Sequence, residues 1–123
     1  MILVDTSVWI DHLRTAEPLL VRLLTDDEIG CHDMVIEELA LGVMKQRDSV
    51  LGLLSNLHRF PTVTHPEILH LVDHRRLWGR GLSAIDVNLL GSVALVSGAQ
   101  LWTRDKRLKA VCAEVGIALA KES

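Results

Sequence analysis

The sequence of 123 residues is short of the features that most readily assign a protein to a class. It has two cysteines, three prolines, one phenylalanine and no tyrosine, and it contains no repeat or low-complexity tract. Cys31 and Cys112 are far apart, form no Cys-x-x-Cys pair and stand beside apolar residues, which favours buried thiols over a disulfide. Without a run of aromatic residues, Trp9, Trp78 and Trp102 are expected in the core or at an interface, not as a platform for stacked bases.

Long apolar runs are also absent. None reaches the roughly 18 residues that a membrane span needs, so no contact with a membrane is expected. The N-terminal residues 1–5 carry no base and reach an acid too early for a secretory signal, which makes the cytoplasm the expected location. A formal net charge of −3 argues against a general nucleic-acid binder. Basic residues do gather at 45–47, 75–80 and 104–109, although each group alone is typical of a solvated face.

Several common catalytic motifs are missing. There is no glycine-rich phosphate loop ending in Lys-Ser or Lys-Thr, and no Gly-x-Ser-x-Gly elbow. Gly79-x-Gly81 lacks the third glycine of a dinucleotide fingerprint. His70 and His74 have the helical spacing of zinc ligands, but Leu71 stands where a zinc protease has its general base. We therefore interpret the two histidines as surface residues.

What the sequence does contain is an alternation of short apolar runs with amphipathic stretches, in a chain whose size suits one domain over residues 1–123. Strands are expected at 2–4, 29–32, 60–63, 101–103 and 117–120. Helices are expected at 8–13, 18–24, 33–43, 48–57, 66–78, 83–97 and 106–115. This alternation predicts an α/β fold with a central, mainly parallel twisted sheet of four to five strands flanked by helices.

Four acids stand where such a fold would bring them to one edge. Asp5 ends the first apolar run, Glu38 lies early in a helix, Asp86 lies in the first turn of the helix opened by Ser83, and Asp105 follows a strand. The carboxyl ends of parallel strands and the starts of the following helices share an edge, where ligands bind. Four converging carboxylates would repel one another unless a cation neutralised them, and hard oxygen ligands suit Mg²⁺ or Mn²⁺.

Each acid also has a purely structural interpretation. Asp5 and Asp105 could cap helices, and Ser83-x-x-Asp86 resembles a capping box. The choice between Glu37 and Glu38 depends on the phase of their helix. Its apolar side centres on residues 35, 39 and 43, which points Glu37 away and puts Glu38 near the border, so Glu38 is the expected inward acid. Three or four acids at one edge form the arrangement that metal-dependent phosphodiester hydrolysis requires.

At this point the sequence resembles the PIN domain, specifically the VapC-type toxin ribonucleases of type II toxin–antitoxin modules. The matching segments appear in the family's order and spacing and extend over essentially the whole chain: Ile2 to Ile10, Glu38 to Gly42, Leu82 to Asp86 and Leu101 to Asp105. Asn88 is a departure, because small or apolar residues are common at its position.

The resemblance implies a PIN fold and a metal-dependent endoribonuclease that inhibits growth, with Mg²⁺ as cofactor and Mn²⁺ as a possible substitute. Asp5 and Asp86 would be the central metal ligands and Glu38 would complete the site. Asp105 would act directly or through water, while Ser7 and Thr103 match supporting polar positions. The implied partners are RNA, a second copy of the chain and a cognate VapB-type antitoxin that covers the active-site groove.

Three competing classes differ from this prediction in specific residues. A phospho-receiver module needs a second acid beside Asp5, where Thr6 stands, and an acid after the third strand, where residues 60–64 have none. A phosphatase of the haloacid-dehalogenase type needs an aspartate at position 7, where Ser7 stands. A catalytically inactive interaction module stays open as the alternative, although an intact set of four acids argues against it.

Overall fold

A four-stranded parallel sheet forms the centre of the computed structural model, which describes residues 1–122. The strands are β1 (Ile2–Val4), β2 (Ile29–Cys31), β3 (His58–Arg59) and β4 (Gln100–Trp102), in the spatial order β3-β2-β1-β4. Every neighbouring pair is parallel. The α/β class and the parallel sheet predicted from the sequence are therefore confirmed.

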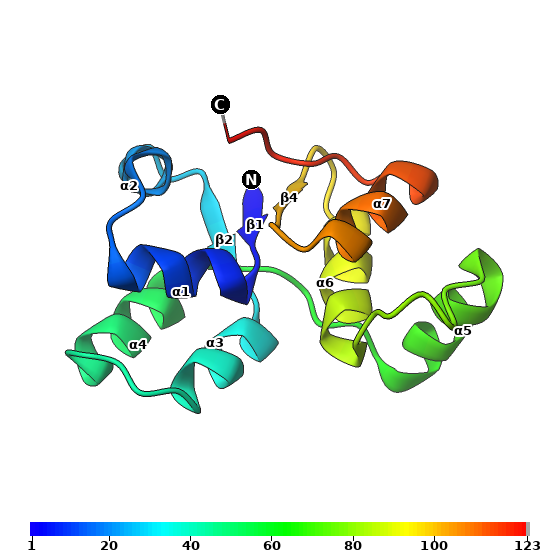
Figure 1. Ribbon diagram of the computed structural model, residues 1–123, viewed down its shortest axis with the longest axis horizontal. Helices are drawn as coiled ribbons and strands as arrows, with labels where there is room; N and C mark the ends of the chain where they lie inside the picture. The colour runs from blue at the N-terminus through cyan, green and yellow to red at the C-terminus, as the bar shows by residue number, and fades with distance from the viewer. Residues whose placement is uncertain (123) are drawn as a thin grey trace.

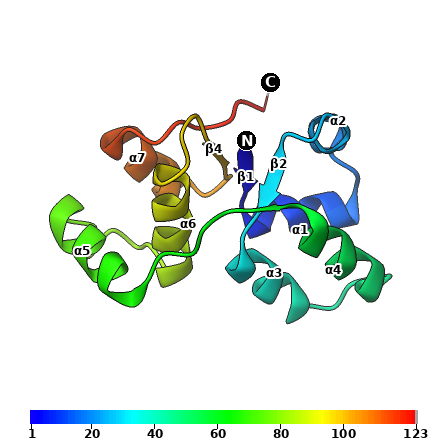
Figure 2. The same ribbon diagram turned by 180° about the vertical axis from the view of Figure 1, so that it is seen from behind.

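Seven helices surround the sheet within residues 1–122: α1 (Thr6–Arg14), α2 (Pro18–Thr25), α3 (Asp33–Ala40), α4 (Arg47–Asn56), α5 (His65–Arg75), α6 (Ala84–Ala94) and α7 (Lys106–Val115). Figure 1 shows α1 to α4 on one side of the strands and α5 to α7 on the other. The connection that follows β3 crosses the molecule between these two groups, as Figure 2 shows from behind. In the described chain, no helix combines the length and the apolar character that crossing a membrane requires.

The core lies around β1 and α6. Leu3 and Val4 of β1 are fully buried, and every residue of α6 from 87 to 93 is buried. The thiols of Cys31 and Cys112 are buried and unbridged, as predicted. Trp9 and Trp102 also belong to the core, whereas Trp78 is 62% exposed.

The third strand lies earlier in the chain than the predicted range 60–63. His58 and Arg59 pair with β2, and the Phe60 amide still donates to the Cys31 carbonyl at 2.8 Å. Pro61 has no amide hydrogen and so cannot continue the ladder. The predicted strand at 117–120 is reduced to one bridge between Leu101 and Leu119.

Three helices end three residues earlier than their patterns predict. The helix predicted through residue 43 stops at Ala40, whose carbonyl accepts from the Arg47 guanidinium at 2.7 Å, and Val43 is fully exposed instead of lying on the apolar side. The helix predicted to reach Trp78 stops at Arg75, since Arg76 has a left-handed backbone. The helix predicted to reach residue 97 stops at Ala94. The last helix, residues 106–115, was predicted correctly.

Candidate metal centre and active site

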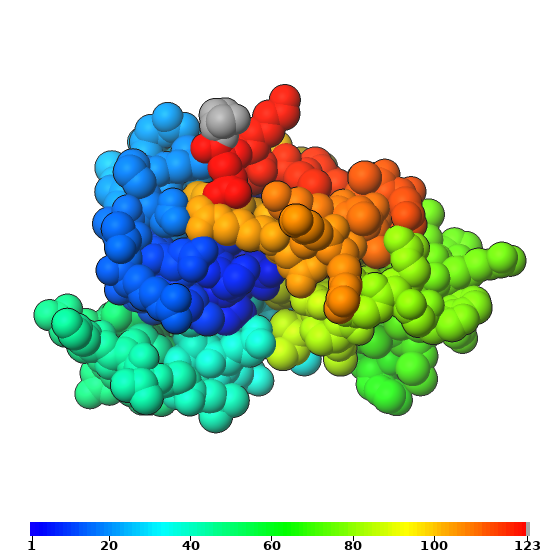
Figure 3. Space-filling view, in the orientation of Figure 1, coloured from blue at the N-terminus to red at the C-terminus, as the bar shows by residue number. Residues whose placement is uncertain are grey.

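The carboxyl ends of β1 and β4 meet the N-termini of α1, α6 and α7 and the body of α3 at one edge of the sheet. Figure 3 shows the helices around a recess: the start of α1 in dark blue, α3 in cyan, the start of α6 in yellow-green and the start of α7 in orange. Strand pairing brings this about, because β1 lies between β2 and β4. The edge at which the sequence predicted a cluster of acids is thus built from segments far apart in the chain.

Asp5 is at the centre of this edge and is only 8% exposed. Its Oδ1 accepts the Thr6 amide at 2.8 Å, so Asp5 caps α1, and its Oδ2 accepts the Thr103 hydroxyl at 2.7 Å. Burial raises the pKa of Asp5, and the negative charges of Asp86 and Glu38 raise it further against the lowering effect of the two hydrogen bonds. Asp5 is therefore electrostatically coupled to each of the other two carboxylates.

Glu38 reaches the same edge from α3. Its Oε1 accepts the Thr6 hydroxyl at 2.6 Å, whereas Glu37 is exposed. No role in the site was predicted for Thr6, yet its amide holds Asp5 and its hydroxyl holds Glu38. The only available signal was its position directly after Asp5. Thr6 is the residue of this site that sequence reasoning missed.

Asp86 and Asp105 both take part in helix capping. Asp86 forms a full capping box with Ser83: Oδ2 accepts the Ser83 amide at 2.9 Å, and the Asp86 amide donates to the Ser83 hydroxyl at 3.1 Å. Asp105 accepts the Leu108 amide at 3.0 Å and is exposed. The structural interpretation of these acids is thus correct. It does not compete with a chemical role, because one hydrogen-bonded oxygen fixes the carboxylate and the second can face a ligand.

The two supporting polar residues lie in different surroundings. The Thr103 hydroxyl is buried, donates to Asp5 and accepts the Asp105 amide at 3.1 Å, so it joins two of the four predicted acids. Ser7 is exposed, and within residues 1–122 its hydroxyl has no hydrogen-bond partner. The roles of both residues remain predictions.

Whether these residues suit a divalent cation depends on their donor atoms and spacing. In the described part of the chain, no three Asp, Glu, His or Cys side chains stand close enough to enclose an ion by themselves. Mg²⁺ does not need such an enclosure, since it keeps several waters and uses one or two carboxylates. Three coupled carboxylates, two of them held by threonine hydroxyls, supply the hard oxygens that it prefers.

Arg104 follows Thr103 and is bound by three carboxylates. Its guanidinium contacts Asp11 at 2.5 Å, Glu17 at 3.0 Å and Glu122 at 2.6 Å. These partners raise its pKa, the contact with Glu122 most strongly. Arg104 therefore fixes the segment after β4 against α1, and its charge is already compensated.

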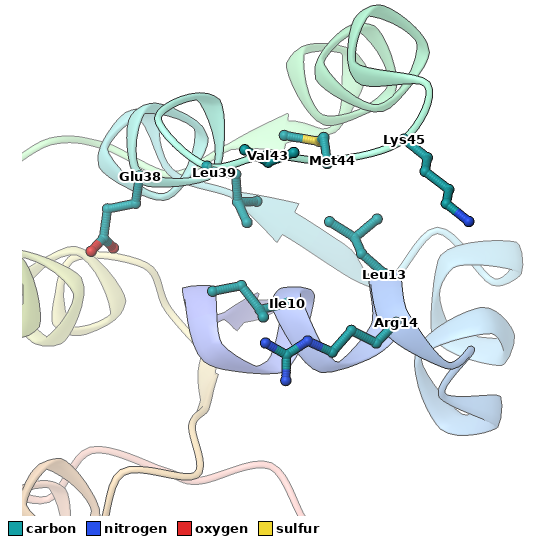
Figure 4. A pocket seen from close by; sticks show the side chains of 9 residues that line it. Ile10, Leu13, Arg14, Glu38, Leu39, Val43, Met44 and Lys45 are labelled. Atoms are coloured by element: carbon teal, nitrogen blue, oxygen red, sulfur yellow. The ribbon is translucent and has the colours of Figure 1, made fainter.

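A groove of about 490 Å³ runs from Glu38 between α1 and the connection that follows α3. Figure 4 shows Ile10 and Leu13 of α1 facing Leu39 and Met44, with the Glu38 carboxylate at one end. Lys45 lies at the other end, and the Arg14 side chain extends along α1 back toward Ile10. Ile10 and Leu13 are each about two-fifths exposed, so this is an apolar surface open to solvent.

Comparison with known proteins shows the family to which the chain belongs. The model of the PIN domain family matches residues 2–114, and the chain belongs to that family. Ribonuclease VapC32 of Mycobacterium tuberculosis, in strains CDC 1551 / Oshkosh and ATCC 25618 / H37Rv, is 74% identical over 122 residues, or 99% of this chain and 98% of the relative. The chain is thus a VapC-type PIN-domain protein, as the resemblance predicted.

A solved structure supports the fold independently. The crystal structure of PAE2754 from Pyrobaculum aerophilum matches with a TM-score of 0.61 and 20% sequence identity. The match covers 89% of this chain and 83% of that one. At this identity the likeness confirms the PIN-like fold and nothing further.

Removal of one charge from the edge should stabilise the metal-free protein. In EDTA, we expect Asp86→Asn to melt higher than wild type, because it relieves repulsion between Asp86 and Asp5 while its amide oxygen still accepts the Ser83 amide. Repulsion on the order of 1 kcal/mol corresponds to roughly 3–6 °C. Added Mg²⁺ should raise the melting temperature of wild type more than that of the variant.

Asp48→Asn is the matched control for this measurement. Asp48 lies in the first turn of α4, so this variant reports the loss of a helix-terminal charge alone, and its response to Mg²⁺ should equal that of wild type. A lower melting temperature of Asp86→Asn in EDTA, together with a wild-type response to Mg²⁺, would show that Asp86 is a cap and not part of a shared metal site.

Proposed function

We propose that this protein is a metal-dependent endoribonuclease and the toxin of a type II toxin–antitoxin module, which cuts RNA and inhibits translation and growth. The observation that carries the proposal is the buried Asp5 carboxylate, held by Thr6 and Thr103 and coupled in charge to Glu38 and Asp86. The 74% identity to Ribonuclease VapC32 supports the same activity. A catalytically inactive interaction module is the alternative.

In this proposal, Asp5 and Asp86 hold Mg²⁺, for which Mn²⁺ can substitute, and Asp105 takes part directly or through water. When bound, the cation polarises the phosphate, makes a coordinated water more acidic and stabilises the leaving oxygen. Glu38 has one oxygen bound to Thr6, which leaves the other to orient or deprotonate the attacking water. Thr6 and Thr103 keep the carboxylates in place throughout.

The RNA backbone would be held by cations that do not already have a carboxylate partner. Arg59, Arg80 and Arg104 are paired with carboxylates. Within residues 1–122, Lys106 and Arg107 at the start of α7 have no such partner, and they lie directly after Asp105. We propose these two residues as the phosphate contacts beside the acids.

We propose that the groove that ends at Glu38 is the binding site of the VapB-type antitoxin. Its exposed apolar side chains and the flanking Arg14 and Lys45 suit a segment with apolar and acidic residues. A partner bound there would cover Glu38 and so block the site. We also propose that the protein forms a homodimer and acts in the cytoplasm.

Two neighbouring glutamates provide the test. Purified protein should cut single-stranded or structured RNA in Mg²⁺ or Mn²⁺ and stop in EDTA. Glu38→Gln should abolish this cleavage and the growth arrest on expression in cells, because it removes a charge at the acidic edge. Glu37→Gln is the matched control and should keep nearly full activity, since Glu37 lies in solvent.

The opposite order of the two variants would show that Glu37 is the functional acid. If wild type, verified as folded and free of antitoxin, cuts no RNA in Mg²⁺ or Mn²⁺, the proposed activity is wrong and the inactive interaction module is favoured.

A further inference from the structure

A buried polar network joins the two helices that carry Glu38 and Asp86. It consists of His32 at the start of α3 with Asn88 and Ser92 of α6, and we call it the His32–Ser92–Asn88 network. The side chains of His32 and Ser92 are fully buried, and Asn88 is 5% exposed. Buried polar groups cost free energy unless they are paired, so a network at this depth has to be satisfied by specific partners.

The direction of its hydrogen bonds follows from His32. The Met34 amide donates to Nδ1 at 3.0 Å, so His32 caps α3 through that nitrogen, and the neutral ring carries its proton on Nε2. Burial lowers the pKa of His32, which keeps the ring neutral. Nε2 therefore donates to the Ser92 hydroxyl at 3.0 Å.

The network also includes the connection between β3 and α5. The Ser92 hydroxyl lies 2.5 Å from the Pro61 carbonyl and 2.8 Å from the Asn88 carbonyl, and the Asn88 side-chain oxygen accepts the Val63 amide at 3.1 Å. This connection packs tightly on α6, since a Cβ on Gly91 would lie 2.8 Å from the Val63 side chain. Three elements are thus tied to one another by buried side chains.

The network lies on the side of α6 that faces away from the acids. At about 100° per residue, Asn88 and Ser92 lie roughly 200° and 240° around the helix from Asp86. Contacts on that side fix the rotation of α6 and hence the direction of the Asp86 carboxylate. His32 likewise fixes the position of the start of α3, and Glu38 follows less than two turns later in that helix.

We infer that His32, Ser92 and Asn88 are positioning residues that hold Glu38 and Asp86 at the spacing a metal ion requires. The inference rests on the proposed function of those acids. It also assigns a role to Asn88, the departure from the family pattern noted in the sequence. Residues that orient metal ligands from behind typically change metal affinity by about 10-fold to 100-fold when replaced.

The test separates positioning from capping with two substitutions at one residue. In His32→Asn, the side-chain oxygen can take the position of Nδ1 and accept the Met34 amide, so the cap of α3 is kept, but the shorter side chain cannot reach Ser92. In His32→Gln, the side-chain amide group can take the position of Nε2 and donate to the Ser92 hydroxyl, but the hydrogen bond that caps α3 is lost. We expect the Mg²⁺ concentration for half-maximal cleavage to rise about ten-fold or more in His32→Asn and to stay near wild type in folded His32→Gln, with KM for RNA unchanged in both.

A second readout needs no activity: the Mg²⁺ concentration that gives half of the metal-induced rise in melting temperature should shift in parallel. Ser92→Ala should behave like His32→Asn. Its matched control is Ser55→Ala, because the Ser55 hydroxyl donates to the Leu51 carbonyl at 2.8 Å but connects no second element. Val111→Ala, in the core at α7, controls for a general loss of stability.

The outcomes distinguish this inference from the proposed function. If wild type shows neither metal-dependent cleavage nor a Mg²⁺-induced rise in melting temperature, the proposed function fails. If wild type shows both and folded His32→Asn needs no more Mg²⁺ than wild type, the positioning role is wrong while the function stands. Should Ser92→Ala fail to fold, His32→Asn decides alone.

Discussion

Asp5→Asn should lower the rate of RNA cleavage by at least about 100-fold while the fold is retained. The substitution removes one charge from the acidic edge but leaves the size of the side chain unchanged, so a bound cation loses attraction without new space at the site. A 100-fold loss corresponds to about 2.7 kcal/mol of activation free energy. The measurement is the single-turnover cleavage rate at saturating Mg²⁺.

Retention of the fold follows from the hydrogen bonds of Asp5. The Asn oxygen can accept the Thr6 amide, and its amide group can donate to the Thr103 hydroxyl, which is both a donor and an acceptor. Circular dichroism and a melting curve would verify this. The control is Asp11→Asn, which removes a charge from α1 on the side bound by Arg104 and should leave cleavage near wild type. Wild-type cleavage by folded Asp5→Asn would contradict a central role of Asp5.

Gly30→Ala should give the largest loss of stability from adding a single methyl group. A Cβ on Gly30 would lie 2.4 Å and 2.7 Å from two ring carbons of Phe60 and 3.0 Å from the His58 carbonyl. Phe60 is only 1% exposed, so its ring has no free space into which to move. Overpacking of this kind costs about 1–3 kcal/mol, and we expect the upper end, which corresponds to a fall in melting temperature of roughly 10 °C.

Gly52→Ala is a control in which the same chemical change should have the opposite sign. Gly52 lies inside α4, and a Cβ there would meet no atom within 4 Å. Alanine favours the helix over glycine, so this variant should gain about 0.5–1 kcal/mol. Urea denaturation of both variants provides the measurement. Equal stability of Gly30→Ala and wild type would show that the contact between β2 and Phe60 can relax. If Gly30→Ala is less stable, adding Phe60→Leu to that variant should restore part of the lost stability.

The sequence predicts an element best where its own residues determine both ends. Helix α7 begins after the capping side chain of Asp105 and ends at Gly116, which has a left-handed backbone, and both signals are local. The bounds of the third strand are not determined locally, because they depend on which residues form hydrogen bonds with β2. The end of α3 depends on Arg47, which lies seven residues beyond Ala40. Tertiary contacts of this kind leave no periodic pattern.

The same distinction applies to the site. Asp5, Asp86 and Asp105 could be placed from the sequence because each stands at the end of a strand or the start of a helix. The hydroxyl contacts of Thr6 and Thr103 could not, since they join residues 32 and 98 positions apart in the chain. Nor could the His32–Ser92–Asn88 network, whose members each look like ordinary polar residues until the fold brings them together.

The pairing of β1 with β4 has a consequence for the chain during its synthesis. Asp5 leaves the ribosome well before Thr103 and the last strand of the sheet, which follow nearly a hundred residues later. Domains fold as units, and contacts so distant in sequence form late. A nascent or prematurely terminated chain that lacks β4 would carry Asp5 and Glu38 without the edge that they share in the folded protein, so the site can form only after β4 has been made.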